Sequence, residues 1–213
     1  MAIVLPRLYA IVDRACLGRQ AGSLAEFVRD LVAAGVALIQ YRNKTGDARE
    51  ILGESREIKR MVAATPGGES VRLIMNDRVD LCLAAEFDGV HLGQDDLSPL
   101  AARAILGPDK CVGISTHNAK QVEESDKWLV DYIAVGPIFT TATKGNPDPV
   151  IGLEGLRTAR SLTAKPLVAI GGITRGNSRA VIAAGADSIA VIGDLLPEPR
   201  RAAEEFLRLL GSD

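Results

Sequence analysis

The sequence is poor in aromatic side chains, histidine and cysteine. Aromatic residues make up 4% of its 213 residues, and it has two histidines and three cysteines, Cys16, Cys82 and Cys111. The odd number and wide spacing of the cysteines exclude a disulfide framework and a CxxC zinc pattern. We therefore expect buried, reduced thiols and a cytoplasmic location.

Long apolar runs and an excess of one charge sign are also missing. No run approaches the ~18 apolar residues of a membrane-spanning helix, and the N-terminus has no basic region followed by a small-residue cleavage site. We therefore expect neither export nor membrane insertion. The formal net charge is −2 and Lys and Arg form no cluster, so no nucleic-acid partner is expected.

The chain does contain regularly alternating segments. Hydrophobic residues make up 47% of it, and short runs rich in Val and Ile alternate with longer segments of helical periodicity, which is typical of βα units in a parallel sheet. The pattern predicts strands near Leu8–Val12, Ala37–Tyr41, Leu73–Met75, Gly89–Leu92, Cys111–Ile114, Tyr132–Val135, Leu167–Ile170 and Ser188–Ile192. It predicts helices that begin near Ser23, Asp47, Asn76, Ser98, Asn118, Gly152, Arg175 and Pro197.

Eight short units with equally apolar strands favour closure over an open, doubly wound sheet. The predicted fold class is α/β, a single (β/α)8 TIM barrel that spans residues 1–213 as one domain. In such barrels the functional groups lie at the C-terminal ends of the strands and in the loops that follow.

The second strand ends in a polar face. A period of two places Gln40, Arg42 and Lys44 on one side, and this side points into the barrel mouth if Ile39 and Tyr41 face the helices. Desolvated cations need an anionic partner, and a bound phosphate would serve. Alternatively, both cations leave the barrel into solvent.

Carboxylates follow the third and fourth strands. Asp77 and Asp96 stand in neighbouring loops, where they could offer oxygen ligands to one Mg²⁺, which takes few carboxylates and completes its shell with water and phosphate oxygens. Each could instead belong to a helix start. Asn76 would then be an N-cap followed by acidic residues in the first turn, and Asp96 would be a loop carboxylate before the next helix. We expect His91 to be a hydrogen-bonded structural residue and not a metal ligand.

Hydroxyl and imidazole groups follow the fifth strand. Ser115 has no visible triad or nucleophile elbow around it, so we expect it to hydrogen-bond a substrate. His117 either belongs to the Asn118 helix start or acts at the site.

The last three strands are followed by candidate phosphate sites. The segment 136–150 is too long for a simple turn and suits a lid, and its hydroxyls and ammonium, Thr141, Thr143 and Lys144, suit a diphosphate. Gly171-Gly172 and Ile192-Gly193 stand where barrels frequently bind phosphate through backbone N–H groups.

Together these motifs resemble the thiamine phosphate synthase family. The resemblance covers nearly the whole chain and is carried by Leu-Tyr-Ala-Ile-Val-Asp at 8–13, Gln-x-Arg-x-Lys at 40–44, Asn-Asp at 76–77, Gly-Val-His-Leu-Gly-Gln-Asp-Asp at 89–96, Gly-Pro-Ile-Phe-Thr-Thr-x-Thr-Lys at 136–144 and Gly-Gly-Ile at 171–173. It implies a Mg²⁺-dependent transferase that joins 4-amino-5-hydroxymethyl-2-methylpyrimidine diphosphate to hydroxyethylthiazole phosphate and releases diphosphate. It also implies that the diphosphate leaves first, before the thiazole nitrogen attacks.

The same resemblance implies roles for individual residues. Asp77 and Asp96 would bind Mg²⁺, and the catalytic set would be Arg42, Ser115 and Lys144, with Lys144 acting on the leaving diphosphate. The substrates would contact Gln40, Arg42, Lys44, Asn76, Ser115, Thr141, Thr143, Lys144, Gly171, Gly172, Ile192 and Gly193. A homo-oligomer is compatible with the family.

Two departures from the family pattern stand out. Asn43 replaces a usual Glu, and we expect it to point away from the cations; Gly193-Asp194 replaces a usual Ser-Ala, and we expect Asp194 to cap the last helix and face away from the phosphate. The alternatives are a thiazole tautomerase of the same family, with His117 as acid/base, and a non-catalytic regulator that binds a thiamine precursor. A phosphosugar epimerase would need paired carboxylates and histidines that we do not find.

Overall fold

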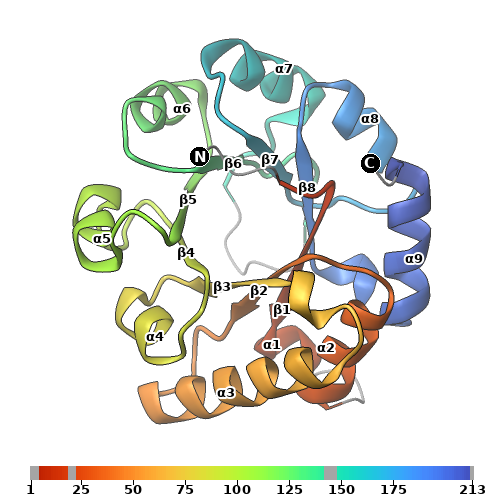
Figure 1. The fold of residues 1–213 in the computed structure, drawn as a ribbon. Coiled ribbons are helices and arrows are strands. Elements are labelled where there is room, and N and C mark those ends of the chain that lie inside the picture. Colours follow the sequence, from red (N-terminus) through yellow and green to blue (C-terminus); the bar gives the residue numbers. More distant parts are fainter. Residues whose placement is uncertain (1–4, 19–22, 142–147, 212–213) are drawn as a thin grey trace.

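The computed structural model describes residues 5–18, 23–141 and 148–211, and these form a closed barrel (Figure 1). Eight parallel strands pair in chain order, and the last pairs with the first. The strands are β1 (Leu8–Asp13), β2 (Leu38–Arg42), β3 (Arg72–Asn76), β4 (Gly89–Leu92), β5 (Cys111–Thr116), β6 (Tyr132–Val135), β7 (Leu167–Ile170) and β8 (Ser188–Val191). The predicted fold class is confirmed.

Helices surround the barrel on the outside (Figure 1). They are α1 (Arg14–Leu17), α2 (Leu24–Ala33), α3 (Ala48–Ala64), α4 (Val79–Ala84), α5 (Pro99–Leu106), α6 (Ala119–Asp126), α7 (Gly152–Leu162), α8 (Ser178–Ala183) and α9 (Pro199–Leu210), with short 3-10 helices η1 (Gly68–Ser70) and η2 (Gly193–Leu195). Four helices begin directly after a predicted start, and the residues there, Ser23, Asp47, Ser98 and Asn118, cap them, because each side chain accepts a backbone N–H of the first turn. In the described part of the chain, no helix is long and apolar enough to span a membrane.

The strands separate two apolar layers. Residues such as Ile39 and Tyr41 face outward and pack with the helices, whereas Leu38, Ile74 and Val168 fill the barrel interior. Burying one such side chain contributes roughly 1.5–3 kcal/mol. The alternation of β2 therefore sends Gln40 and Arg42 inward, as the sequence predicted.

Three helices begin later than predicted, and one was not predicted. α4 begins at Val79 instead of Asn76, α8 at Ser178 instead of Arg175, and α9 at Pro199 instead of Pro197, while α1 follows β1 directly. α4 is delayed because Asp77 adopts a left-handed backbone conformation with φ of 60°, which a helix cannot contain.

The cysteines carry no disulfide, but their burial is uneven. Cys82 and Cys111 are buried, which raises their pKa values to about 11 and about 12. Cys16, on the short α1, is only half-buried. The prediction of a buried thiol is therefore wrong at this position.

Candidate functional site

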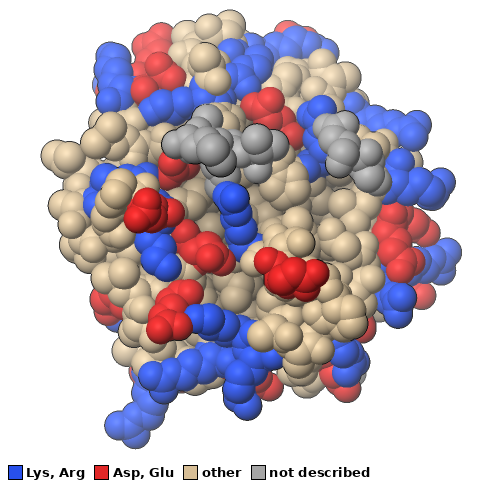
Figure 2. All heavy atoms as spheres, in the orientation of Figure 1, with Lys and Arg blue, Asp and Glu red and all other residues tan. Residues whose placement is uncertain are grey.

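A large cavity opens at the C-terminal ends of the strands. Its volume is about 950 Å³, and every one of the eight strands or the loop after it contributes to the lining. Figure 2 shows acidic and basic side chains around a central hollow on the face that it presents. The cavity brings together all the predicted site residues within the described ranges: Gln40, Arg42, Lys44, Asn76, Asp77, Asp96, Ser115, Thr141, Gly171, Gly172, Ile192 and Gly193.

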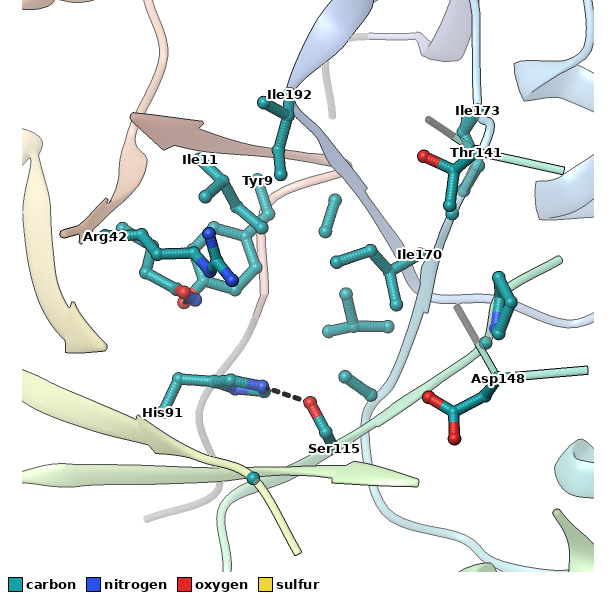
Figure 3. A pocket seen from close by; sticks show the side chains of 18 of the residues that line it. Tyr9, Ile11, Arg42, His91, Ser115, Thr141, Asp148, Ile170, Ile173 and Ile192 are labelled. Atoms are coloured by element: carbon teal, nitrogen blue, oxygen red, sulfur yellow. Dashed lines mark hydrogen bonds between the residues drawn. The ribbon is translucent and has the colours of Figure 1, made fainter. Parts of the chain in front are cut away.

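Thr143 and Lys144 lie outside the described residues. Their predicted contacts with the diphosphate therefore stay predictions. Thr140 and Thr141, which precede them in the same segment, line the cavity. Figure 3 shows Thr141 near Ile173, which follows β7.

The two cations of the β2 face already have carboxylate partners. Arg42 forms an ion pair with Asp13, whose side chain is 2% exposed, and Lys44 forms an ion pair with Asp77. These ion pairs are an addition to the prediction, and phosphate binding by the two cations stays a prediction. The alternative of solvation does not hold for Arg42, which is 20% exposed, but Lys44 is 48% exposed.

Asp13 was not predicted as a site residue. It ends β1, caps α1 by accepting the N–H of Cys16 at 3.1 Å, and holds the Arg42 guanidinium with its other oxygen. The sequence did contain a signal for this ion pair: β1 ends in Asp13 and the neighbouring strand β2 ends in Arg42. The two residues lie opposite each other in the register of the two strands.

Asp77 and Asp96 adjoin in space. Burial raises the pKa of Asp77 above its ordinary value, the ion pair with Lys44 opposes the rise, and the hydrogen bond and charge of Asp96 add to it. Asp96 in turn accepts the N–H of Gly93 at 2.7 Å. The two predicted metal ligands are therefore brought together, although the described residues contain no group of three or more His, Cys, Asp or Glu that could hold a metal ion.

Asp77 does not belong to a helix cap. The N-cap position of α4 is Arg78, and no side chain caps it. The left-handed conformation of Asp77 costs about 1–2 kcal/mol relative to ordinary backbone, and it is held by the hydrogen bond from its N–H to the His91 carbonyl at 2.8 Å. Strain of this kind persists where the surroundings fix it, often at functional sites.

Ser115 has a histidine partner that the sequence did not reveal. His91 Nε2 lies 2.8 Å from Ser115 Oγ, and His91 Nδ1 lies 2.8 Å from the Tyr132 hydroxyl. Figure 3 shows His91 pointing toward Ser115 across the cavity floor. His91 is thus a hydrogen-bonded histidine, as predicted. The group that bonds the other ring nitrogen of His91 is the phenol of Tyr132 and not the carboxylate of a catalytic triad.

His117 lines the cavity beside the entrance to the long loop. Its Nδ1 lies 2.8 Å from the Gly136 carbonyl oxygen and 3.4 Å from Asp148 Oδ2. The next residue, Asn118, caps α6. Both expectations for His117 thus remain compatible with its place, since it adjoins a helix start and also faces the cavity.

The glycines after β7 approach the neighbouring loop closely. Gly171 and Gly172 have φ values of 100° and 63°, and a Cβ at Gly172 would lie 2.5 Å from the Thr140 carbonyl oxygen. Only glycine fits these positions without strain. Gly193 lies on the same side of the mouth, and nothing lies within 4 Å of a Cβ added there.

Asp194 does not cap the last helix. The N-cap of α9 is Glu198, whereas Asp194 accepts hydrogen bonds from the backbone N–H of Arg175 at 2.8 Å and from its Nε at 3.0 Å. Asp194 lies in the short η2, four residues before that cap, and Arg175 reaches it from the β7–α8 loop. It lines the cavity with its charge matched by a guanidinium. Asn43, by contrast, bonds Glu54 and the backbone of Thr45 and Gly46, away from the cations as predicted.

Fold and cavity together define a class of protein. A (β/α)8 barrel with paired carboxylates and cations on one side of its mouth, and glycine turns after β7 and β8 on the other, is a barrel enzyme built for phosphorylated substrates.

The comparisons with known proteins name the family. The model of the thiamine monophosphate synthase family matches residues 8–195. The thiamine-phosphate synthase of Koribacter versatilis (strain Ellin345) is 60% identical over 98% of this chain and 97% of its own length. The synthase of Clostridium novyi (strain NT) is 42% identical over 89% and 90%. The solved thiamine phosphate pyrophosphorylase of Pyrococcus furiosus superposes with a TM-score of 0.82 at 32% identity, over 96% of this chain and 95% of the other. This chain belongs to the thiamine monophosphate synthase family and is a transferase.

Proposed function

We propose that this protein joins 4-amino-5-hydroxymethyl-2-methylpyrimidine diphosphate to hydroxyethylthiazole phosphate, forming thiamine phosphate and diphosphate. The observation that carries the proposal is the division of the mouth. Charged side chains lie on the side of β2, β3 and β4, and glycine turns lie after β7 and β8. Two differently phosphorylated substrates need two such regions, with space between them for their rings.

The charged side suits the diphosphate. Lys44, Arg42 and Asn76 offer hydrogen-bond donors to its oxygens, and Arg42 is already held in place by the buried carboxylate of Asp13. Preorganised charges stabilise a leaving group at little reorganisation cost. Thr143 and Lys144 are proposed to act on the same group, with Lys144 taking the charge of the departing oxygens.

The carboxylate pair suits Mg²⁺. Two adjoining carboxylates, Asp77 and Asp96, fit a hard cation that takes few protein ligands and completes its shell with water and phosphate oxygens. Bound there, Mg²⁺ would neutralise charge on the diphosphate as it leaves. Lys44, now paired with Asp77, would then be released toward the diphosphate.

The glycine side suits the single phosphate of the thiazole. Gly171, Gly172, Ile192 and Gly193 line the cavity, and the three glycines have no side chains, so a terminal phosphate could reach backbone N–H donors beside them. The pyrimidine would lie between, against Gln40 and Ser115. Arg42, Ser115 and Lys144 form the proposed catalytic set, which assists departure of the diphosphate and positions the ring.

The test mixes purified protein, Mg²⁺ and both substrates, and measures thiamine phosphate by mass spectrometry. We expect product that requires Mg²⁺ and both substrates. Isomerisation of the thiazole without thiamine phosphate would instead indicate the tautomerase. Binding of either precursor without any turnover would indicate a regulator.

A further inference from the structure

Five polar side chains from five strands form a continuous hydrogen-bonded row across the barrel interior. Gln40 Nε2 donates to the Tyr9 hydroxyl at 2.7 Å, and the Tyr9 and Tyr132 hydroxyls lie 3.0 Å apart. The row continues from Tyr132 to His91 Nδ1 and from His91 Nε2 to Ser115 Oγ, both at 2.8 Å. We call these residues the interior row. Both ends, Gln40 and Ser115, line the cavity.

The centre of the interior row is shielded from water. Tyr9 is 1% exposed and Tyr132 is 0% exposed. Burial raises the pKa of each tyrosine far above its ordinary value. Both phenols therefore keep their protons at neutral pH. Each hydroxyl has one proton to donate, and an undonated proton in such a place is costly.

Counting these protons fixes the direction of the row. In the structure the Gln40 amide nitrogen faces the Tyr9 hydroxyl, and an amide nitrogen only donates, so in this amide orientation Tyr9 accepts from Gln40 and directs its own proton to Tyr132. Tyr132 must then donate to His91 Nδ1, which therefore carries no proton. The proton of the neutral imidazole is on Nε2 and is donated to Ser115.

The opposite direction leaves a buried donor without a partner. If His91 Nδ1 carried a proton, it would donate to Tyr132, and Tyr132 would have to donate to Tyr9. With the Gln40 amide nitrogen toward Tyr9, as in the structure, Tyr9 would then accept from both Gln40 and Tyr132, and its own proton would have no acceptor among the hydrogen bonds of the interior row. The opposite direction would therefore also require the Gln40 amide to reverse and present its oxygen to Tyr9. A charged imidazolium also carries a proton on Nδ1 and would leave the Tyr9 proton without an acceptor in the same way.

We propose that Tyr9, Tyr132 and His91 are positioning residues that fix the direction of hydrogen bonding, so that Ser115 presents its hydroxyl proton to the cavity and Gln40 presents its amide oxygen. The functional part of this inference rests on the proposed function, because it takes Gln40 and Ser115 to contact the pyrimidine substrate. The cavity floor is then a donor on the β5 side and an acceptor on the β2 side. It would select a ring with an acceptor atom facing Ser115 and an amino donor facing Gln40.

The first test measures the tautomer directly and needs no substrate. The ¹⁵N chemical shifts of the imidazole nitrogens distinguish the two neutral tautomers, and the chain has only two histidines. We expect His91, assigned by its disappearance in His91→Gln, to carry its proton on Nε2. His117 is an internal contrast, because its Nδ1 faces the Gly136 carbonyl oxygen and must carry a proton. A proton on His91 Nδ1 would overturn the proposal.

The second test changes single hydroxyls. Tyr132→Phe removes the donor to His91 Nδ1, so the tautomer should no longer be fixed, and kcat/KM for the pyrimidine diphosphate should fall about 10-fold, as for other orienting partners of a functional histidine. Tyr9→Phe should keep the Nε2 tautomer, because Tyr132 still donates to His91. In Tyr132→Phe, the KM for the thiazole phosphate should change less than twofold, which distinguishes the effect from a general loss of folded enzyme.

Tyr41→Phe is the matched control. Tyr41 is also a buried tyrosine, but its hydroxyl bonds Glu54 on the outer side of β2, away from the interior row. We expect it to leave the His91 tautomer and kcat/KM within about twofold of the parent. Unchanged kinetics in Tyr132→Phe would overturn the positioning role. If the unaltered protein makes no thiamine phosphate, the proposed function fails, whereas the tautomer measurement still tests the direction of the row.

Discussion

The two sides of the cavity mouth are built from different chemical groups. Around β2, β3 and β4 the site consists of side chains that hold one another, as in the pairs Arg42–Asp13 and Lys44–Asp77. After β7 and β8 it consists largely of backbone, with Gly171 and Gly172 in conformations that other residues avoid. One side is organised by charge and can rearrange around a metal or a diphosphate. The other is organised by shape, and at Gly171 and Gly172 it has no room for an added Cβ.

This difference suits two binding tasks. A diphosphate that must leave gains from mobile countercharges, since Lys44 is half exposed and can exchange Asp77 for a phosphate oxygen. A phosphate that merely anchors its substrate gains from a rigid backbone that needs no ordering on binding. Substitutions on the two sides should therefore fail in different ways: the glycine side in stability and acceptor binding together, and the charged side in metal dependence alone.

The largest effect is expected at the glycine side, from Gly172→Ala. The new Cβ would lie 2.5 Å from the Thr140 carbonyl oxygen and 2.8 Å from Phe139 Cβ, at a φ of 63°. We expect a loss of roughly 2–4 kcal/mol in the free energy of unfolding. Displacement of the loop should also lower kcat/KM for the thiazole phosphate by about 10²-fold. Denaturant titration and steady-state kinetics measure the two effects.

Gly67→Ala separates conformational strain from the clash. Gly67 also has a positive φ, of 87°, but nothing lies within 4 Å of its added Cβ, and it is far from the cavity lining. It should lose only about 1–2 kcal/mol and keep its kinetics. Equal losses of activity in both variants would mean that the Gly172 backbone has no special part in acceptor binding.

The next effect is expected at the charged side, from Asp77→Asn and Asp96→Asn. Each removes one anionic oxygen from the adjoining carboxylates and should weaken the apparent affinity for Mg²⁺ by roughly 10- to 100-fold. Asparagine keeps an acceptor for the Gly93 N–H that Asp96 now binds, so the fold should be retained. A Mg²⁺ titration of the rate measures the change, with Asp80→Asn, an exposed partner of Arg78, as the control. Identical Mg²⁺ curves in all variants would refute the assignment.

The same difference explains how much the sequence could predict. The charged side was readable because polar residues at a strand end break an apolar pattern, and a period of two put Gln40, Arg42 and Lys44 together. The strands Gly89–Leu92 and Tyr132–Val135 were predicted with their observed bounds. These features depend on local pattern, which a single sequence contains.

What the sequence could not predict depends on partners distant in the chain. Tyr132 looks like an ordinary residue of a buried strand, because tyrosine favours strands, and only its place opposite Tyr9 and His91 reveals its hydrogen bonds. For Asp77 the sequence left a helix start open as the alternative to a metal ligand, and only its left-handed backbone excludes that alternative. Asp194 was predicted to cap the last helix, which follows it in the chain. Its actual partner, Arg175, lies on another loop, and the sequence alone does not reveal this contact.

That pair gives the smallest expected effect and the finest test of the two-sided mouth. Asp194 places a carboxylate on the side proposed to bind a phosphate, and Arg175 forms an ion pair with it. The Asp194 side chain is 22% exposed and the Arg175 side chain is 32% exposed. Arg175→Ala should leave the carboxylate unmatched and raise the KM for the thiazole phosphate by roughly 3- to 10-fold at low salt. Asp194→Ala should change this KM by less, and the double variant should bind better than Arg175→Ala alone, because the repelling charge is gone. If the single and double variants have the same KM at every salt concentration, the pair acts only as a link between the two loops, and the glycine side takes its affinity from backbone alone.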